Sequence, residues 1–137
     1  MTNYVLDTSA LIGLERGNKA VIERFRELVK DESIFYTTML NIAEFYYGYA
    51  GKSKEAKKIA NEFIDRFKLL TLTLDSARNY AEFAYLHDQA GEKIEDFDLL
   101  TAAIAMDNNA IIITLDKGFD RIRGAKTLLL QQHIRMY

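Results

Sequence analysis

The fold is decided by a short apolar run that ends in an acid, Ala110-Ile111-Ile112-Ile113-Thr114-Leu115-Asp116. An apolar run of this length, rich in β-branched residues, is typical of a strand buried in a parallel sheet. A similar run near the start of the chain, Tyr4-Val5-Leu6, is followed at once by Asp7. In an open parallel sheet, ligands bind at the carboxyl ends of strands, near the point where the strand order reverses. Asp7 and Asp116 therefore stand where a functional site is expected.

Working outward, apolar runs alternate with amphipathic stretches, which indicates an α/β fold with a parallel sheet. The expected strands are Tyr4–Leu6, Ile34–Tyr36, Leu69–Leu74, Ala110–Thr114 and Thr127–Leu130. The expected helices are one through Val21–Val29, Met39–Tyr49 with Thr37 or Thr38 as its cap, one after the cap Ser53, one from the cap Asp75 to about Ala90, and Phe97–Asn108. Residues 91–95 are expected to form a loop.

The composition is that of an ordinary globular domain, with 49% hydrophobic and 28% charged residues. We expect the 137 residues to form one domain, 1–137. The chain has no cysteine, which excludes thiolate metal sites and disulfides and favours a reducing, cytoplasmic location. The first residues lack the pattern of a signal peptide, and no stretch approaches the roughly 20 apolar residues of a membrane helix. We therefore expect no membrane association.

The formal net charge is −2, so the surface as a whole does not attract nucleic acid. If nucleic acid is the substrate, the attraction must come from a local basic patch. Lys117, Arg121 and Arg123 lie beside Asp116 in sequence and are the better candidates for contacts to an RNA backbone. The lysines between residues 52 and 68 are interpreted as the solvated face of a helix.

Glu44 lies in a predicted helix that is apolar almost all round and is therefore expected to be largely buried. Asn41, Glu44 and Gly48 follow one another at i, i+3 and i+7, which places them in a single stripe. A carboxylate within such a helix is costly unless it is paired or bound to a metal. We interpret the stripe as the wall of a cleft, although a solvent-facing stripe on a surface helix has the same spacing.

Two acids, Asp96 and Asp98, stand near the start of the last predicted helix. The unpaired N–H groups of a helix N-terminus favour negative charge, which explains one carboxylate there but not both, because the two repel. We assign Asp96 to helix capping. Asp98 is assigned to the cleft, since it shares its face of the helix with small or polar residues such as Thr101.

Asp7 could simply cap a helix, and Asp116 could serve a turn, so the case rests on all four acids together. Carboxylates in one pocket raise one another's pKa and destabilise the fold unless a cation neutralises them. Oxygen ligands without His or Cys favour Mg²⁺ or Mn²⁺. Such a cation activates water for attack on a phosphodiester and stabilises the charge of the transition state. The pattern therefore predicts a metal-dependent nuclease.

At this point the sequence resembles a known family, the PIN-domain ribonucleases, and within it the small VapC-type toxins of toxin–antitoxin pairs. The resemblance runs nearly end to end and is carried by four motifs in the family's order: residues 4–12, 38–48, 96–105 and 114–119. It implies a Rossmann-like domain with a parallel sheet of order 3-2-1-4-5 and helices on both sides. It also implies Mg²⁺- or Mn²⁺-dependent endoribonuclease activity on RNA, a homodimer, and inhibition by a co-expressed antitoxin.

The resemblance further implies roles for single residues. Asp7 and Asp98 resemble the inner metal ligands, whereas Glu44 and Asp116 resemble outer ligands that act partly through water. Many relatives carry asparagine where Asp116 stands. Two hydroxyl residues, Thr8 and Thr114, resemble groups that orient these carboxylates.

Other functions remain open from the sequence alone. A housekeeping RNA-processing nuclease would show the same acids, and so would a non-enzymatic interaction module whose acids only cap helices. A phosphoaspartate hydrolase or a receiver domain is disfavoured because Asp7 has no acidic neighbour at position 9 or beside it. His87 and His133 stand in polar contexts and are expected at the surface. The aromatic residues 45–49 are interpreted as core or dimer surface.

Overall fold

The computed structural model describes residues 1–30 and 32–130, which form a parallel sheet of order β3-β2-β1-β4-β5 with helices on both faces. This is the order that the family resemblance implied. The strands are β1 Thr2–Leu6, β2 Ser33–Thr38, β3 Lys68–Leu70, β4 Ala110–Thr114 and β5 Thr127–Leu129. The helices are α1 Thr8–Glu15, α2 Lys19–Val29, α3 Met39–Tyr47, α4 Lys54–Ile64, α5 Leu74–Gln89, α6 Asp96–Asp107 and the 3₁₀ helix η1 Lys117–Arg121.

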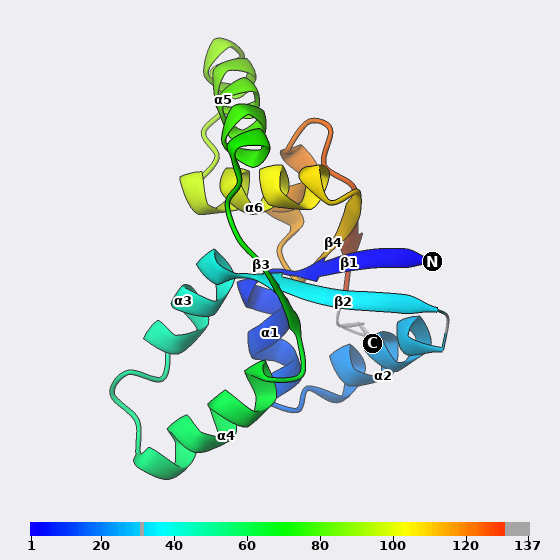
Figure 1. The fold of residues 1–137 in the computed structure, drawn as a ribbon, viewed down its shortest axis with the longest axis vertical. Helices are drawn as coiled ribbons and strands as arrows, with labels where there is room; N and C mark the ends of the chain where they lie inside the picture. Colours follow the sequence, from blue (N-terminus) through cyan, green and yellow to red (C-terminus); the bar gives the residue numbers. More distant parts are fainter. Residues whose placement is uncertain (31, 131–137) are drawn as a thin grey trace, which may run out of the picture.

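The two central strands send alternate side chains to opposite faces of the sheet, as the pleat of a strand requires. Val5 and Ile112 enter one buried cluster, whereas Leu6 and Ile113 enter the other. Both faces of β1 and β4 are therefore apolar, which explains why these strands show no alternation in the sequence. Figure 1 shows the result, with α5 and α6 above the sheet and α1 to α4 below it.

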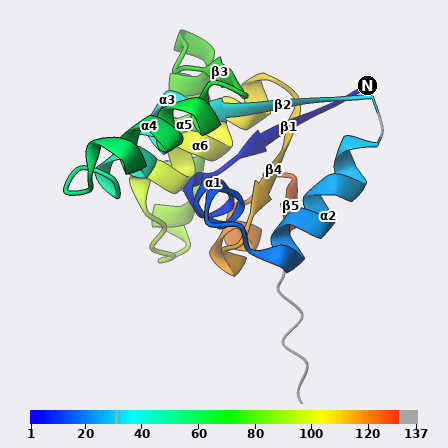
Figure 2. The ribbon, with the colours of Figure 1, turned by 90° about the horizontal axis from the view of Figure 1, so that it is seen from below.

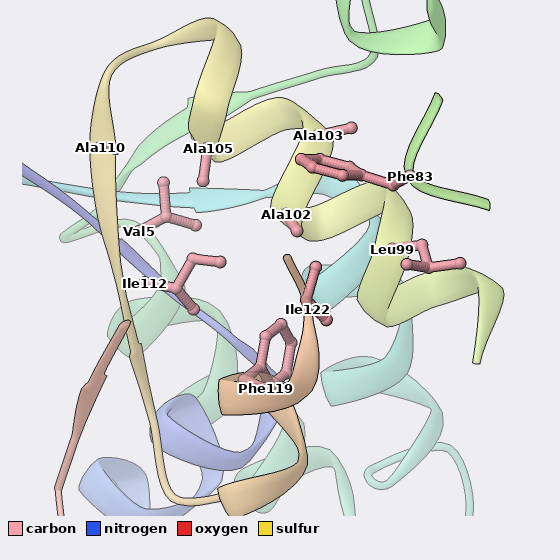
Figure 3. Packing of buried hydrophobic residues seen from close by; sticks show 10 residues of the cluster. All are labelled: Val5, Phe83, Leu99, Ala102, Ala103, Ala105, Ala110, Ile112, Phe119 and Ile122. Atoms are coloured by element: carbon pink, nitrogen blue, oxygen red, sulfur yellow. The ribbon is translucent and has the colours of Figure 1, made fainter. Parts of the chain in front are cut away.

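The upper layer is packed through small side chains. Ala102 and Ala105 of α6 lie against Val5 and Ile112, and the segment around η1 closes the cluster with Phe119 and Ile122 (Figure 3). Alanines let the helix approach the sheet closely, because they present little more than the backbone. The lower layer is built around α1, with α2 and the α3–α4 pair at opposite ends of it in both views (Figure 2).

Several predicted boundaries are confirmed. Residues 110–114 form β4 as expected, and Thr38 and Ser53 cap α3 and α4 through bonds from Asn41 N and Ala56 N. Helix α3 ends at Tyr47 with Gly48 as its C-cap, so it is shorter than expected. It is also less buried than expected: Met39 is 47% and Tyr47 84% exposed.

The predicted boundary between β3 and α5 is wrong. Strand β3 ends at Leu70, and the cap of α5 is Thr73 rather than Asp75. Thr73 and Ser76 form a reciprocal capping box, which satisfies two backbone N–H groups at once. Asp75 lies inside the first turn, where its charge is favourable without capping the backbone.

His87 is not at the surface, contrary to the expectation; only 1% of it is exposed. It belongs to the inward stripe of α5 together with Ser76 and Phe83. Its Nε2 accepts a hydrogen bond from Arg123 N at 3.3 Å, so Nε2 carries no proton and Nδ1 donates to Glu92 Oε1 at 3.0 Å. The neutral imidazole thus ties α5 to the segment after η1. His133 lies outside the described residues.

In the described part of the chain, none of the helices combines the length and the apolar character needed to cross a membrane.

We predict that His87→Leu lowers the free energy of unfolding by about 1–3 kcal/mol, because Arg123 N–H loses its acceptor. Urea denaturation measures the change. Gln89→Leu, an exposed position on the same helix, is the control and should change stability by no more than about 0.5 kcal/mol. Equal stability of the two variants would show that the imidazole bonds contribute nothing.

Candidate active site

The candidate site lies at the carboxyl ends of β1 and β4, the two strands between which the strand order reverses. Asp7 follows β1 directly, and its backbone N–H bonds to Ile113 O at 3.1 Å. Asp116 follows β4 by two residues. Glu44 comes from α3, which begins where β2 ends, and Asp98 comes from the first turn of α6. All four acids thus start from the same edge of the sheet.

Asp7 is the most tightly held of the four acids. It is 3% exposed, and its Oδ1 accepts from Ala10 N at 2.9 Å and from Ser9 Oγ at 2.7 Å, while Oδ2 accepts from Thr114 Oγ1 at 2.5 Å. Burial nevertheless raises its pKa, and the charge of Asp116 adds to this, against the lowering effect of the three hydrogen bonds. Asp7 therefore does cap α1, as one interpretation of the sequence had it. Capping alone does not require the carboxylate to be buried, so it does not explain the position of Asp7.

Asp116 also caps an element, because its Oδ1 accepts from Gly118 N at 2.8 Å at the start of η1. Its side chain is exposed. Its backbone N–H donates to Thr114 Oγ1 at 2.9 Å, and the same hydroxyl donates to Asp7. Thr114 Oγ1 therefore bonds the carboxylate of Asp7 and the backbone N–H of Asp116, and so links the ends of β1 and β4.

Glu44 is partly buried and accepts a hydrogen bond from Thr8 Oγ1 at 2.7 Å. Thr8 in turn accepts from Asn41 Nδ2 at 3.0 Å. A surface hollow of about 390 Å³ opens beside Glu44 and is bounded by Thr8, Ala43, Tyr47 and Phe97. The predicted stripe of Asn41, Glu44 and Gly48 is buried at Asn41, which is 3% exposed, and open to solvent at Gly48.

The pKa of Asp98 is affected by all the other acids of the candidate site. This pKa is raised from 3.8 to about 6, chiefly by burial and further by the charges of Asp116, Glu95, Asp7 and Glu44. Each of these carboxylates is therefore near enough to repel Asp98 appreciably. Within residues 1–30 and 32–130, none of the four predicted acids forms an ion pair with a Lys, Arg or His side chain.

The donor set suits a hard cation, because it consists of carboxylates whose mutual repulsion nothing in the described chain neutralises. In the described residues, no three Asp, Glu or His side chains stand close enough together to enclose an ion. Asp7 Oδ2 has a lone pair left after its bond to Thr114. By donor type and charge, the residues fit Mg²⁺ or Mn²⁺.

Asp96 does not cap α6, contrary to the prediction. The N-cap is Glu95, which makes no side-chain cap bond, and Asp96 is the first helical residue. Its Oδ1 accepts from Tyr80 Oη of α5 at 2.9 Å and raises the pKa of Tyr80. At the first helical position the carboxylate still benefits from the helix dipole, but its hydrogen bond goes to Tyr80 of α5 and not to the backbone of α6.

The basic candidates take different environments. Lys117 and Arg121 are exposed on η1, directly after Asp116. Arg123 is exposed as well, but its Nη2 pairs with Glu92 Oε1 at 3.2 Å. The lysines of α4 (Lys54, Lys57 and Lys58) are exposed, while Ala60 and Ile64 face the core, as expected of a solvated face.

Ser9 belongs to the site but is not among the residues predicted from the sequence. Ser9 Oγ donates to Asp7 and accepts from Leu115 N at 2.9 Å, so it joins the two strand ends. Its position two residues after Asp7 at the start of a helix is the only signal that could have indicated it. Asn41 was placed in the stripe, but its contacts to Thr8, Thr38 and Thr101 are visible only in the structure.

The sequence matches the family model of the PIN domain over residues 4–125. No protein of the curated set matches it. Its fold is similar to that of VapBC2 from Rickettsia felis bound to a promoter DNA fragment, with a TM-score of 0.84, 22% identity, and 93% of this chain and 98% of that chain covered. VapBC-1 from nontypeable Haemophilus influenzae has a TM-score of 0.82 and 24% identity, with 94% of this chain and 98% of that chain covered. FitAcB from Neisseria gonorrhoeae has a TM-score of 0.79 and 21% identity, with 93% of this chain and 97% of that chain covered. At these identities the likeness shows the fold.

We predict that, in EDTA, the stability of the protein falls as pH rises from about 4 through about 6. The folded state keeps a proton on Asp98 up to about pH 6, whereas the unfolded chain loses it near 3.8, so the folded state binds more protons in this window. Asp98→Asn should remove this part of the pH dependence and melt higher than the wild type at pH 7.5. Thermal melting across pH measures both effects.

The control is Glu23→Gln, which makes the same change of carboxylate to amide at an exposed position of α2. It should leave the pH dependence unchanged. An Asp98→Asn variant that melts lower than the wild type at pH 7.5 would show that Asp98 stabilises the fold.

Proposed function

The chain belongs to the PIN domain family, and on that basis we propose that it is a Mg²⁺- or Mn²⁺-dependent endoribonuclease, the toxin of a toxin–antitoxin pair. The observation that carries the proposal is Asp7, a buried carboxylate whose pKa is raised and which lies at the switch point of the sheet. The charge of Asp116 raises the pKa of Asp7 further, and the charges of Asp7, Glu44 and Asp116 all raise the pKa of Asp98. A bound cation offsets this repulsion.

Asp7 and Asp98 are proposed as the direct ligands, with Glu44 and Asp116 acting partly through water. A bound divalent cation supplies an acidified water and positive charge for the phosphodiester oxygens. The chain holds the ligands in place: three donors fix Asp7, Thr8 fixes Glu44, and Thr114 links Asp7 to the backbone of Asp116. These bonds limit the movement of each carboxylate, and a cation would still have to draw them together, because no three acids of the described residues enclose an ion.

The partner proposal rests on the solved structures of similar fold, whose names are those of VapBC and FitAB-type assemblies, some bound to DNA. We propose that this chain, a single PIN domain over residues 1–137, likewise binds a cognate antitoxin. Exposed apolar side chains on α3 and α6, Met39, Tyr47 and Phe97 among them, support the homodimer that the sequence predicts.

We predict that the protein cleaves RNA with Mg²⁺ or Mn²⁺ and not with EDTA, and that Asp7→Asn, Glu44→Gln and Asp98→Asn each reduce cleavage by at least about 100-fold, as expected when a charge-stabilising group is lost. Cleavage of a labelled single-stranded RNA, followed on denaturing gels, measures the rate. Growth arrest on induced expression, absent for Asp98→Asn, tests the role as a toxin.

Glu23→Gln is again the matched control and should cleave at the wild-type rate. Full cleavage by the wild type in EDTA, or by any one acid variant, would contradict the metal site or that residue's place in it.

We also predict that RNA binding depends on Lys117 and Arg121 and not on α4. Contacts to a single strand change the salt slope by roughly 0.7 each, and groups beyond a Debye length of about 8–10 Å contribute little. Lys117→Ala/Arg121→Ala should weaken binding and flatten its salt dependence, measured in the Asp98→Asn background. Lys57→Ala/Lys58→Ala removes the same charge and should change little. Arg123, paired with Glu92, should matter less than Lys117.

If the α4 variant weakens binding more than the η1 variant, the RNA lies along α4, and the carboxylate site is unaffected by that result.

A further inference from the structure

The side chain of Asn41 is buried among three hydroxyl groups from three different elements. Its Nδ2 donates to Thr8 Oγ1 of α1 at 3.0 Å. Its Oδ1 accepts from Thr38 Oγ1, at the end of β2, at 2.7 Å and lies 3.3 Å from Thr101 Oγ1 of α6. Asn41 is 3% exposed and lies three residues before Glu44 on α3. A buried amide needs its partners, because each unpaired polar group there costs free energy.

The orientation of the amide follows from proton counting. Thr8 has one hydroxyl proton, and its oxygen lies 2.7 Å from Glu44 Oε1, which as a carboxylate only accepts. The proton of Thr8 must therefore point to Glu44. The atom of Asn41 that faces Thr8 must then be the NH₂ group, since an amide oxygen there would leave two acceptors competing for one proton.

The other end of the amide is fixed in the same way. Thr38 Oγ1 already accepts from Asn41 N at 3.1 Å, so its own proton is free to go to Asn41 Oδ1. Thr101 gives its proton mainly to Phe97 O, at 2.8 Å, and its contact to Asn41 is the weaker of the two. Hydrogen-bond donation thus follows one direction, which we call the relay: Thr38 donates to Asn41, Asn41 to Thr8, and Thr8 to Glu44.

We propose that Asn41 is a positioning residue, which fixes the Glu44 carboxylate for the cation through the hydroxyl of Thr8. Its contacts also hold α1, α3 and α6 in fixed positions relative to one another at the site. Thr8 follows Asp7, Asn41 precedes Glu44 by one helical turn, and Thr101 follows Asp98 by one turn. From its place one turn before Glu44, the amide of Asn41 therefore contacts residues near Asp7 and Asp98. The inference rests on the proposed function and adds to it a residue that carries no charge.

The test is a double-mutant cycle on Mn²⁺ binding without RNA, measured by electron paramagnetic resonance of free Mn²⁺. Asn41→Leu keeps the approximate volume and removes the donor, and Thr8→Val keeps the shape and removes the hydroxyl. Each single variant should weaken Mn²⁺ binding by roughly 10–100-fold, the usual effect of losing a partner of a ligand. The double variant should bind no more weakly than Thr8→Val alone, because Asn41 acts through Thr8.

Thr37→Val is the matched control. Thr37 is a buried threonine beside Thr38 whose hydroxyl donates to Leu6 O at 2.8 Å, outside the relay, so Mn²⁺ binding should stay at the wild-type value. Thr8→Ser, which keeps the hydroxyl that Thr8→Val removes, should bind Mn²⁺ like the wild type. In the Thr8→Ser background, Asn41→Leu should again weaken Mn²⁺ binding. If Asn41→Leu melts below the assay temperature, Asn41→Ala replaces it, since it removes the same donor and leaves room for water.

Additive losses in the double variant, or an Asn41→Leu variant with wild-type Mn²⁺ binding, would overturn the inference and leave the proposed function standing. A wild-type protein that binds Mn²⁺ but cleaves no RNA would overturn the proposed function, while the binding cycle still decides the role of Asn41. A wild type that neither binds nor cleaves overturns both.

Discussion

The structure depends on the burial of one carboxylate, Asp7, at the end of the central strand. Burial disfavours its charged form and raises its pKa. Hydrogen bonds from Ser9, Ala10 N–H and Thr114, rather than a basic side chain, stabilise the charge. These donors come from α1 and from the end of β4. The same bonds that stabilise the charge therefore join the first helix to the strand that carries Asp116, so the site and the sheet are built together.

The sheet places the remaining acids at little cost to its own stability. β1 and β4 are apolar on both faces, and their side chains alternate between two clusters, so the acids stand at the strand ends, where Asp7 is buried and Asp116 is exposed. Glu44 and Asp98 arrive on helices that start at the same edge. Burial, and after it the repulsion from neighbouring carboxylates, raises the pKa of Asp98 to about 6, so the charged form opposes folding locally and a cation is favoured.

Polar groups that sequence reasoning treated as local serve tertiary contacts. Asp96, a predicted helix cap, bonds Tyr80 of the neighbouring helix, and His87, predicted at the surface, ties α5 to Arg123. Thr73 replaced Asp75 as a cap because Ser76 could complete a capping box with it. For Asp96 and His87 the partner lies on another element, which spacing in the sequence does not show. Thr73 and Ser76 stand at the i, i+3 spacing of a capping box, so this pair is a signal that the sequence does contain.

The two apolar runs of the sequence by themselves indicate β1 and β4 as strands buried on both faces of a parallel sheet, with Asp7 and Asp116 as acids at one edge of it. The strand order comes from the resemblance to the PIN-domain family, and Glu44 and Asp98 are predicted from the small or polar residues that share their helix faces. Only the tertiary structure decided how those acids are held. Thr114 lies 107 residues from Asp7 and Thr101 60 residues from Asn41, so their bonds depend on how α1, α3, α6 and β4 pack. Side-chain periodicity specifies which face of an element is buried, but the direction of a hydroxyl proton is set by the atoms that folding brings around it.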